Sequence, residues 1–430
     1  MKDFILKGNI LYSKDKDKIE AFPDSYLVCV EGKSAGVFRN IPEIYKSLPV
    51  KDCGNKLIIP TMTDLHVHAP QYAFRGTGMD MELLEWLQSS TFPEEARYEN
   101  LDYAEKAYDI FVEDMKRSAT SHACIFATRH KEATCLLMEK LEKSGLHSFV
   151  GKVNMDRDAP DDLVEKSAEV SMNDTLSWLE CTFGKFENTK PMLTPRFLPC
   201  CTNELLSYLE DIRRKYSLPV QSHLSENMGE IELVSKLFPE TEFYAQGYDE
   251  YSLLGRDNKN GESFKTVMAH CVYSGEAERA LLKKNGVFIA HCPTSNTDLS
   301  SGIAPIKRYL KEGMKTGLGS DVAGGHTLSI FDCIVHSVQV SKLYFRLKEP
   351  DLKPLTFEEA FFMGTEGGGE FFGKVGSFRK DYEFNALILD DLKVPCPHEM
   401  TIRDRLERAV YLSLDRNCIE EKYVCGNKII

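Results

Sequence analysis

The sequence lacks the features of several large classes of protein. It contains no run of 18 consecutive apolar residues, which argues against a membrane-spanning helix. Charged residues near the start, at Lys2, Asp3 and Lys7, interrupt the apolar stretch that a signal peptide needs. Positive charge is scarce, because 53 Lys and Arg face 66 Asp and Glu, a formal net charge of −13. This balance argues against nucleic-acid polymers and anionic membranes as partners.

The 13 cysteines are an odd number and include no C-x-x-C pair. A secreted disulfide framework favours even, clustered cysteines, so we expect reduced thiols and a cytoplasmic protein. The H-E-x-x-H motif of metalloproteases and the P-C-x-x-C motif of cytidine deaminases are also absent. No internal repeat, low-complexity tract or Pro/Ser-rich linker divides the 430 residues.

From Leu57 onward, apolar strand-like runs alternate with stretches of helical periodicity, such as Asn203–Tyr216 and Gly275–Lys284. Eight strands that alternate with helices predict an α/β fold, and eight is the number that closes a (β/α)8 TIM-type barrel. The predicted strands are Leu57–Asp64, Ser121–Thr128, His147–Met155, Met192–Phe197, Val220–His223, Thr266–His270, Val287–His291 and Lys315–Asp321.

Both ends of the chain carry short β-forming runs between Asp-, Lys- and Gly-rich breaks. We expect residues 1–58 plus 374–430 to form a small flanking β-sandwich, and residues 59–373 to form the catalytic barrel. Two connections, at 69–95 and 237–264, are longer than ordinary βα loops, which have about 2–6 residues. Long loops after barrel strands lie on the catalytic face, so both are predicted to be pocket walls or lids.

Histidines and one aspartate stand at the ends of several predicted strands. His66 and His68 are two residues apart in a strand, so both imidazoles point to the same side. His223, His270 and Asp321 each close a later strand, which predicts one cluster at the rim of the barrel. Catalytic zinc uses about three or four protein ligands and lowers the pKa of water to about 7. His66, His68, His223 and Asp321 supply such a set.

The roles of the neighbouring groups stay open at this stage. His270 could be a fifth ligand, or could hydrogen-bond the water or the substrate. Asp321 could hold the metal, deprotonate the water, or do both. Glu226 follows His223 by three residues and is the best candidate for a general acid and base, although a carboxylate that stabilises a helix start would have the same position.

This pattern resembles the signature of the amidohydrolase superfamily: H-x-H after the first strand, histidines after the fifth and sixth, and aspartate after the eighth. Longer stretches resemble the guanine deaminase family, and they are spread over nearly the whole chain. These stretches are Asp64–Tyr72, Leu84–Leu87, Thr91–Pro93, Thr194–Phe197, Ser222–Glu226, Val267–His270, His291–Asn296 and Gly317–Gly325.

The resemblance implies hydrolytic deamination of guanine to xanthine and ammonia, in purine catabolism or salvage, on one Zn²⁺, with Fe²⁺ as an alternative. It implies that Glu226 moves a proton from the attacking water to a ring nitrogen and then toward the leaving amine. His270 would lie beside the water and the substrate, and a homodimer is the usual assembly. The implied metal ligands are His66, His68, His223 and Asp321, and the implied purine contacts are Gln71, Arg196, Phe197 and His223.

Other functions share part of this pattern. A different mononuclear deaminase or a chlorohydrolase for another heterocyclic amine would keep the same ligands, and only Gln71 with Arg196-Phe197 favours guanine. Two-metal members need a carboxylated lysine at the end of the fourth strand, whereas Lys190 precedes that strand here. A metal-free scaffold on the same barrel is the remaining alternative. Such scaffolds typically lose the ligands that this chain retains.

Overall fold

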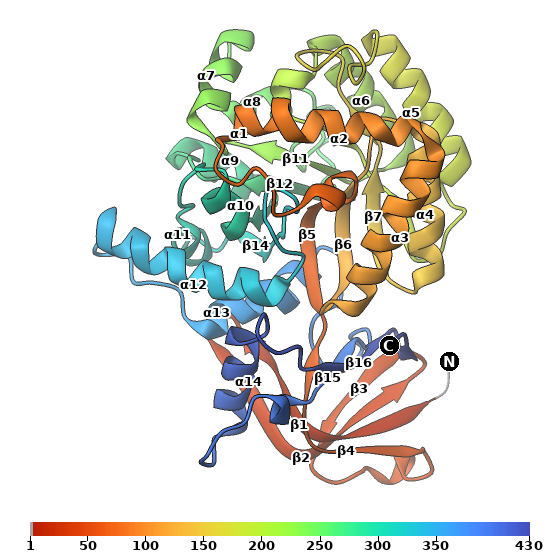
Figure 1. The fold of residues 1–430 in the computed structure, drawn as a ribbon, viewed down its shortest axis with the longest axis vertical. Coiled ribbons are helices and arrows are strands. Elements are labelled where there is room, and N and C mark those ends of the chain that lie inside the picture. Colours follow the sequence, from red (N-terminus) through yellow and green to blue (C-terminus); the bar gives the residue numbers. More distant parts are fainter. Residues whose placement is uncertain (1–2) are drawn as a thin grey trace.

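A computed structural model describes residues 3–430 of the protein. Strands from both ends of the chain form one seven-stranded sheet, in the order β17-β16-β15-β4-β1-β2-β3, at the lower end of the molecule in Figure 1. The prediction of two packed sheets is therefore wrong. The reason is that β4 pairs with β1 on one side and with β15 on the other, which joins both ends into one ladder. The strands are β1 Phe4–Asp15, β2 Lys18–Val30, β3 Lys33–Phe38, β4 Val50–Pro60, β15 Ala386–Leu389, β16 Ile419–Val424 and β17 Asn427–Lys428.

Buried apolar side chains lie on both faces of this sheet, and the alternation of side chains along the strands explains how. In β4, Ile58 belongs to one apolar cluster, while Leu57 and Ile59 belong to the main core of the molecule. β15 alternates in the same way, with Ile388 in the small cluster and Leu387 in the main core. The second face packs against α13 (Phe357–Phe362) and α14 (Ile402–Tyr411), which attaches the sheet to the rest of the protein.

The other strands form two four-stranded parallel sheets, in the orders β5-β6-β7-β9 and β11-β12-β13-β14. Backbone hydrogen bonds connect the two sheets on both sides: Gln221 N–H donates to Leu193 O at 2.9 Å, and Asp321 N–H donates to His66 O at 2.8 Å. The arrangement is a TIM-barrel-like α/β fold. The strands are β5 Met62–His68, β6 Thr120–Phe126, β7 His147–Gly151, β9 Thr189–Pro191, β11 Val220–Leu224, β12 Thr266–His270, β13 Phe288–His291 and β14 Lys315–Leu318, with the short pair β8 Val153–Asn154 and β10 Thr194–Pro195.

Two predicted strands differ from the structure. The first was expected at Leu57–Asp64, but β4 ends at Pro60 in the small sheet and β5 begins at Met62. The apolar run is continuous because it crosses from one sheet into the next. The fourth was expected at Met192–Phe197, but only short pieces form around Pro191 and Pro195, which have no backbone N–H to donate.

Helices lie on the outside of the parallel strands (Figure 1). Several of them begin with a side-chain cap from Asn, Ser or Thr, as at Asn100 before α3 and Thr202 before α6. Among residues 3–430, no helix is long and apolar enough to cross a bilayer. The helices not yet named are α1 Leu83–Trp86, α2 Phe92–Ala96, α3 Leu101–Arg117, α4 Lys131–Ser144, α5 Ala168–Thr182, α6 Asn203–Tyr216, α7 Met228–Leu237, α8 Tyr244–Asp249, α9 Glu276–Lys284, α10 Pro293–Asp298, α11 Ile306–Lys311 and α12 Ile330–Leu347.

One buried lysine joins the small sheet to the parallel strands. The Nζ of Lys422, in β16, donates to the carbonyl oxygens of Met115, Ser118 and Thr120 at 2.8–3.2 Å. Lys422→Met keeps the length of the side chain but leaves three carbonyls without this donor. We expect the free energy of unfolding to fall by about 3 kcal/mol, because each unsatisfied buried group costs about 1–3 kcal/mol.

Chemical denaturation measures this effect, and Lys428→Met is the matched control. Lys428 lies on the same edge of the sheet but is exposed and pairs with Glu421. An exposed pair contributes about 0–1 kcal/mol, so this control should be close to wild type. Equal stability of the two variants would contradict the role of Lys422.

Candidate active site

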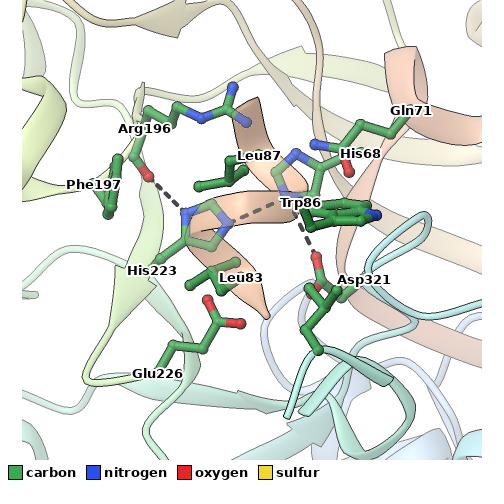
Figure 2. Close-up of a pocket in the computed structure, with 11 residues that line it drawn as sticks. His68, Gln71, Leu83, Trp86, Leu87, Arg196, Phe197, His223, Glu226 and Asp321 are labelled. Atoms are coloured by element: carbon green, nitrogen blue, oxygen red, sulfur yellow. Dashed lines mark hydrogen bonds and ion pairs between the residues drawn. The ribbon is translucent and has the colours of Figure 1, made fainter. Parts of the chain in front are cut away.

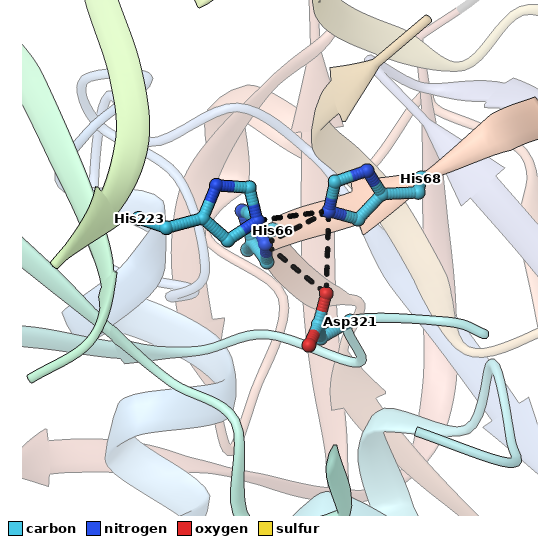
Figure 3. Close-up of side chains that lie close together, drawn as sticks. All are labelled: His66, His68, His223 and Asp321. Carbon is cyan, nitrogen blue, oxygen red and sulfur yellow. Dashed lines mark hydrogen bonds and ion pairs between the residues drawn. The ribbon is translucent and has the colours of Figure 1, made fainter. Parts of the chain in front are cut away.

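Four side chains from three separate parts of the chain meet at one end of the parallel strands (Figure 3). His66 and His68 leave β5, His223 leaves β11, and Asp321 follows β14. The Nε2 atom of His68 lies 3.2 Å from the Nε2 atoms of both His66 and His223. Asp321 Oδ1 lies 3.1 Å from His66 Nε2 and 3.4 Å from His68 Nε2. The structure thus brings together the four residues that the sequence predicted as metal ligands.

Hydrogen bonds on the far side of two rings fix which nitrogen faces the cluster. His66 Nδ1 lies 2.7 Å from Gln221 Oε1, and His223 Nδ1 lies 2.6 Å from the backbone oxygen of Arg196. Each Nδ1–H donates to an oxygen, so each Nε2 presents a lone pair to the centre. Burial lowers the pKa of His68 to about 4, which keeps that ring neutral as well. Lone pairs and a carboxylate at these distances repel each other unless a cation lies between them, so the donor set fits a divalent metal.

The backbone around Asp321 is held by a second carboxylate. Asp64 accepts hydrogen bonds from Ser320 N at 3.0 Å and from Ser320 Oγ at 2.5 Å, and also from His66 N at 3.1 Å. It therefore fixes the segment of Asp321 against the strand of His66. Gly319 is required here, because a Cβ at that position would lie 2.9 Å from His66 Cβ.

His270 and Glu226 lie beside the four-residue cluster. His270 Nδ1 is 2.9 Å from Asn296 Oδ1, and its Nε2 has no hydrogen-bond partner among residues 3–430. That Nε2 lies 3.4 Å from Glu226 Oε2 and 3.7 Å from Asp321 Oδ2. Burial raises the pKa of Glu226 to about 8, and the charge of Asp321 adds to the rise. His270 thus faces both carboxylates.

A pocket opens beside the cluster (Figure 2). The predicted wall at 69–95 does line it, because α1 and the π-helical turn after it contribute Leu83, Trp86 and Leu87. The second predicted wall, 237–264, contributes no lining residue, so that prediction is wrong. Instead, Tyr248 in α8 donates its hydroxyl to the backbone oxygen of His223 at 3.0 Å and so supports the end of β11. The remaining lining residues are His68, Gln71, Arg196, Phe197, His223, Glu226, Leu299 and Asp321.

The sequence did not indicate the partner of Arg196. Glu95 pairs with its guanidinium through two contacts, at 2.5 and 3.2 Å, and accepts a hydrogen bond from Gln71 Nε2 at 2.9 Å. Gln71 Oε1 in turn accepts from Ala323 N at 3.3 Å. Glu95 and Arg196 are only 1 and 2% exposed. An arginine at a strand end, if buried, needs a buried carboxylate as its counter-charge. This rule predicts that a partner exists, but it does not identify which of the acidic residues in the sequence it is.

Comparison with known proteins places the chain in a family. A model of the amidohydrolase family matches residues 57–423. The guanine deaminase of Dictyostelium discoideum is 36% identical, over 99% of this chain and 98% of the relative. A crystal structure of guanine deaminase from C. acetobutylicum with bound guanine is 45% identical, covers both chains completely and has a TM-score of 0.95. The E. coli guanine deaminase structure is 26% identical, covers 100% of this chain and 99% of that one, and has a TM-score of 0.85. The chain therefore belongs to the amidohydrolase family and, within it, to the guanine deaminases.

Proposed function

We propose that this chain hydrolyses guanine to xanthine and ammonia in a zinc-dependent reaction. The observation that carries the proposal is the pocket itself. It joins an apolar wall and the polar Arg196–Gln71 pair to a metal-binding set with a carboxylic acid, Glu226, beside it. Full-length similarity to guanine deaminases supports the same activity.

His66, His68, His223 and Asp321 would hold the ion. Three imidazole nitrogens and one carboxylate oxygen suit Zn²⁺, and they would also accept Fe²⁺. When bound, such an ion supplies a Lewis acid that lowers the pKa of water to about 7. The four side chains come from rigid strand ends, so they need little rearrangement to bind it.

Glu226 is proposed as the group that carries the proton. The reaction forms a bond between the water oxygen and the purine carbon and breaks the bond from that carbon to the amine. Glu226, in its carboxylate form, takes one proton from the water and gives it to a ring nitrogen. It then carries the second proton of that water to the amine, which leaves as ammonia. Ser301 Oγ donates to Glu226 Oε1 at 3.1 Å, which leaves Oε2 directed at His270. His270 would hold the water and the substrate from the other side.

The substrate contacts follow from the shape and polarity of a purine. Its flat faces suit the aromatic and aliphatic wall of Phe197, Trp86 and Leu87. Its polar edges need donors and acceptors, which Arg196 and Gln71 provide. His223 belongs to the metal-binding set and also lines the pocket, so it would contact both the ion and the substrate (Figure 2).

Ammonia release from guanine, adenine, cytosine and pterins tests this proposal. We expect kcat/KM for guanine to be at least roughly 100-fold higher than for the others. A base with a different pattern of donors and acceptors along its edge would leave polar groups of the pocket without hydrogen bonds. Treatment with a chelator should abolish turnover, and added Zn²⁺ should restore it. Preference for another heterocyclic amine would favour the alternative deaminase, and metal-independent turnover would contradict the proposed chemistry.

We infer further that the eight parallel strands close into a barrel, and that residues 1–58 plus 374–430 form a separate small domain beside residues 59–373. The backbone hydrogen bonds on both sides of the two parallel sheets support the first inference. We also infer a homodimer in the cytoplasm. The 13 unpaired thiols suit a reducing compartment, and light scattering of the purified protein would test the dimer.

A further inference from the structure

A second group of possible metal ligands lies at the opposite end of the parallel strands. His122 is near the start of β6, and His147 is the first residue of β7, directly beside it in the register. Glu383 precedes β15, and Cys425 lies in the turn between β16 and β17. In Figure 1, β15 and β16 lie beneath the lower end of β6. The group therefore spans the contact between the small sheet and the parallel strands.

The ligand atoms of this group lie close together: those of His122, His147 and Glu383 are within 4.8 Å of one another, and Cys425 Sγ contacts Glu383 and His147. His122 Nε2 lies 3.1 Å from Glu383 Oε2, and Cys425 Sγ lies 3.4 Å from the same oxygen and 3.6 Å from His147 Nε2. Nitrogen, oxygen and sulfur ligands at about 2.0–2.3 Å from a tetrahedral zinc are separated by about 3.3–3.6 Å. The distances resemble those of the candidate active site, where neighbouring ligand atoms are 3.1–3.4 Å apart.

We propose that His122, His147, Glu383 and Cys425 bind a second divalent ion, Zn²⁺ by preference, as a structural site. Two neutral imidazoles, a carboxylate and a thiolate carry a charge of −2, which balances the ion. The sulfur ligand favours zinc over the hard cations Mg²⁺ and Ca²⁺. Four protein ligands fill the tetrahedron and leave no position for substrate, which is typical of a structural site.

Neighbouring groups orient these ligands. His122 Nδ1 lies 2.8 Å from Ser121 Oγ; when Nδ1–H donates to that hydroxyl, Nε2 presents a lone pair. Asn385 is 1% exposed and contacts both ligands of the small sheet. Its Nδ2 donates to Glu383 Oε2 at 3.2 Å, and its Oδ1 accepts from Cys425 N at 2.8 Å.

The competing explanation is an ordinary hydrogen-bond network, in which His122 and the thiol of Cys425 donate to Glu383. The two explanations differ in metal content. Full-length protein is loaded with Zn²⁺, freed of loosely bound ion by gel filtration, and analysed by mass spectrometry of the metal. We expect two equivalents per chain in wild type and one in the double variant His147→Ala/Cys425→Ser, with guanine turnover unchanged. One equivalent in wild type, or two in the double variant, would overturn the proposal.

Cobalt substitution adds a readout that does not depend on activity. A thiolate bound to Co²⁺ gives a near-ultraviolet charge-transfer band, and the four residues of the candidate active site include no sulfur. The band should appear in wild type and disappear in Cys425→Ser. Cys135→Ser, which changes another half-buried thiol, in α4, is the matched control and should keep the band. A wild-type spectrum without the band, or a band that survives in Cys425→Ser, would contradict the assignment.

Discussion

Glu226→Gln is expected to lower the turnover of guanine by about 10²–10⁴-fold, the usual contribution of a general acid and base. An amide has nearly the shape of the carboxylic acid, and its oxygen can still accept from Ser301 Oγ, so the pocket should stay intact. It cannot take a proton from water and return it to the purine. The measurements are kcat by ammonia release and the zinc content of the same preparation.

The metal content separates a proton-transfer role from a structural one. Glu226 does not belong to the four-residue set, so the variant should bind as much zinc as wild type. Glu232→Gln, an exposed carboxylate in the neighbouring helix α7, is the matched control and should be fully active. Turnover within tenfold of wild type in Glu226→Gln would show that another group carries the proton.

The sequence was sufficient to predict that the four candidate metal ligands lie together, because each stands at a predictable point of a repeating unit. Residues i and i+2 of a strand share a side, which brings His66 and His68 together. Parallel strands end at one rim, which adds His223 and Asp321 from 155 and more residues away. Both arguments use only the order of the strands and helices along the chain. An error in the exact strand boundaries does not change their result. The prediction that these four side chains lie together therefore did not depend on the fourth strand, which is shorter than expected and interrupted.

Three features could not be predicted from the sequence. Each depends on contacts between distant segments, and neither strand periodicity nor the order of the elements determines such contacts. One example is the small sheet, where the position of β4 between β1 and β15 decides whether the chain ends form one sheet or two. Another is the group of His122, His147, Glu383 and Cys425, which lie up to 303 residues apart and follow no ligand spacing. Glu95 is the third example. The acidic pair Glu94-Glu95 at the end of a long loop resembles an ordinary solvated helix start, and only the fold shows that both are buried and that Glu95 pairs with Arg196.

Glu95→Gln is expected to raise the KM for guanine by about 10–100-fold, or about 1.4–2.7 kcal/mol, with a smaller effect on kcat. Glu95 touches neither the metal-binding set nor the carboxylate of Glu226, so it acts as a positioning residue. Its loss leaves the Arg196 guanidinium buried without a counter-charge and frees Gln71 to rotate. Breaking a buried pair in this way also costs stability, about 3–5 kcal/mol. Steady-state kinetics, zinc content and chemical denaturation of one preparation measure all three effects.

A double-mutant cycle decides whether Glu95 acts through Arg196. Once Arg196→Met has removed the guanidinium, adding Glu95→Gln should change the KM far less than it does in wild type, because the two residues share one interaction. Glu94→Gln is the matched control, since Glu94 contacts Tyr103 and Arg97 rather than the pocket. It should leave the KM for guanine unchanged. Additive effects of the two substitutions on KM, or an equal increase in Glu94→Gln, would contradict this role. Glu95 would then support the loop as a whole and would not set the position of Arg196, the proposed purine contact.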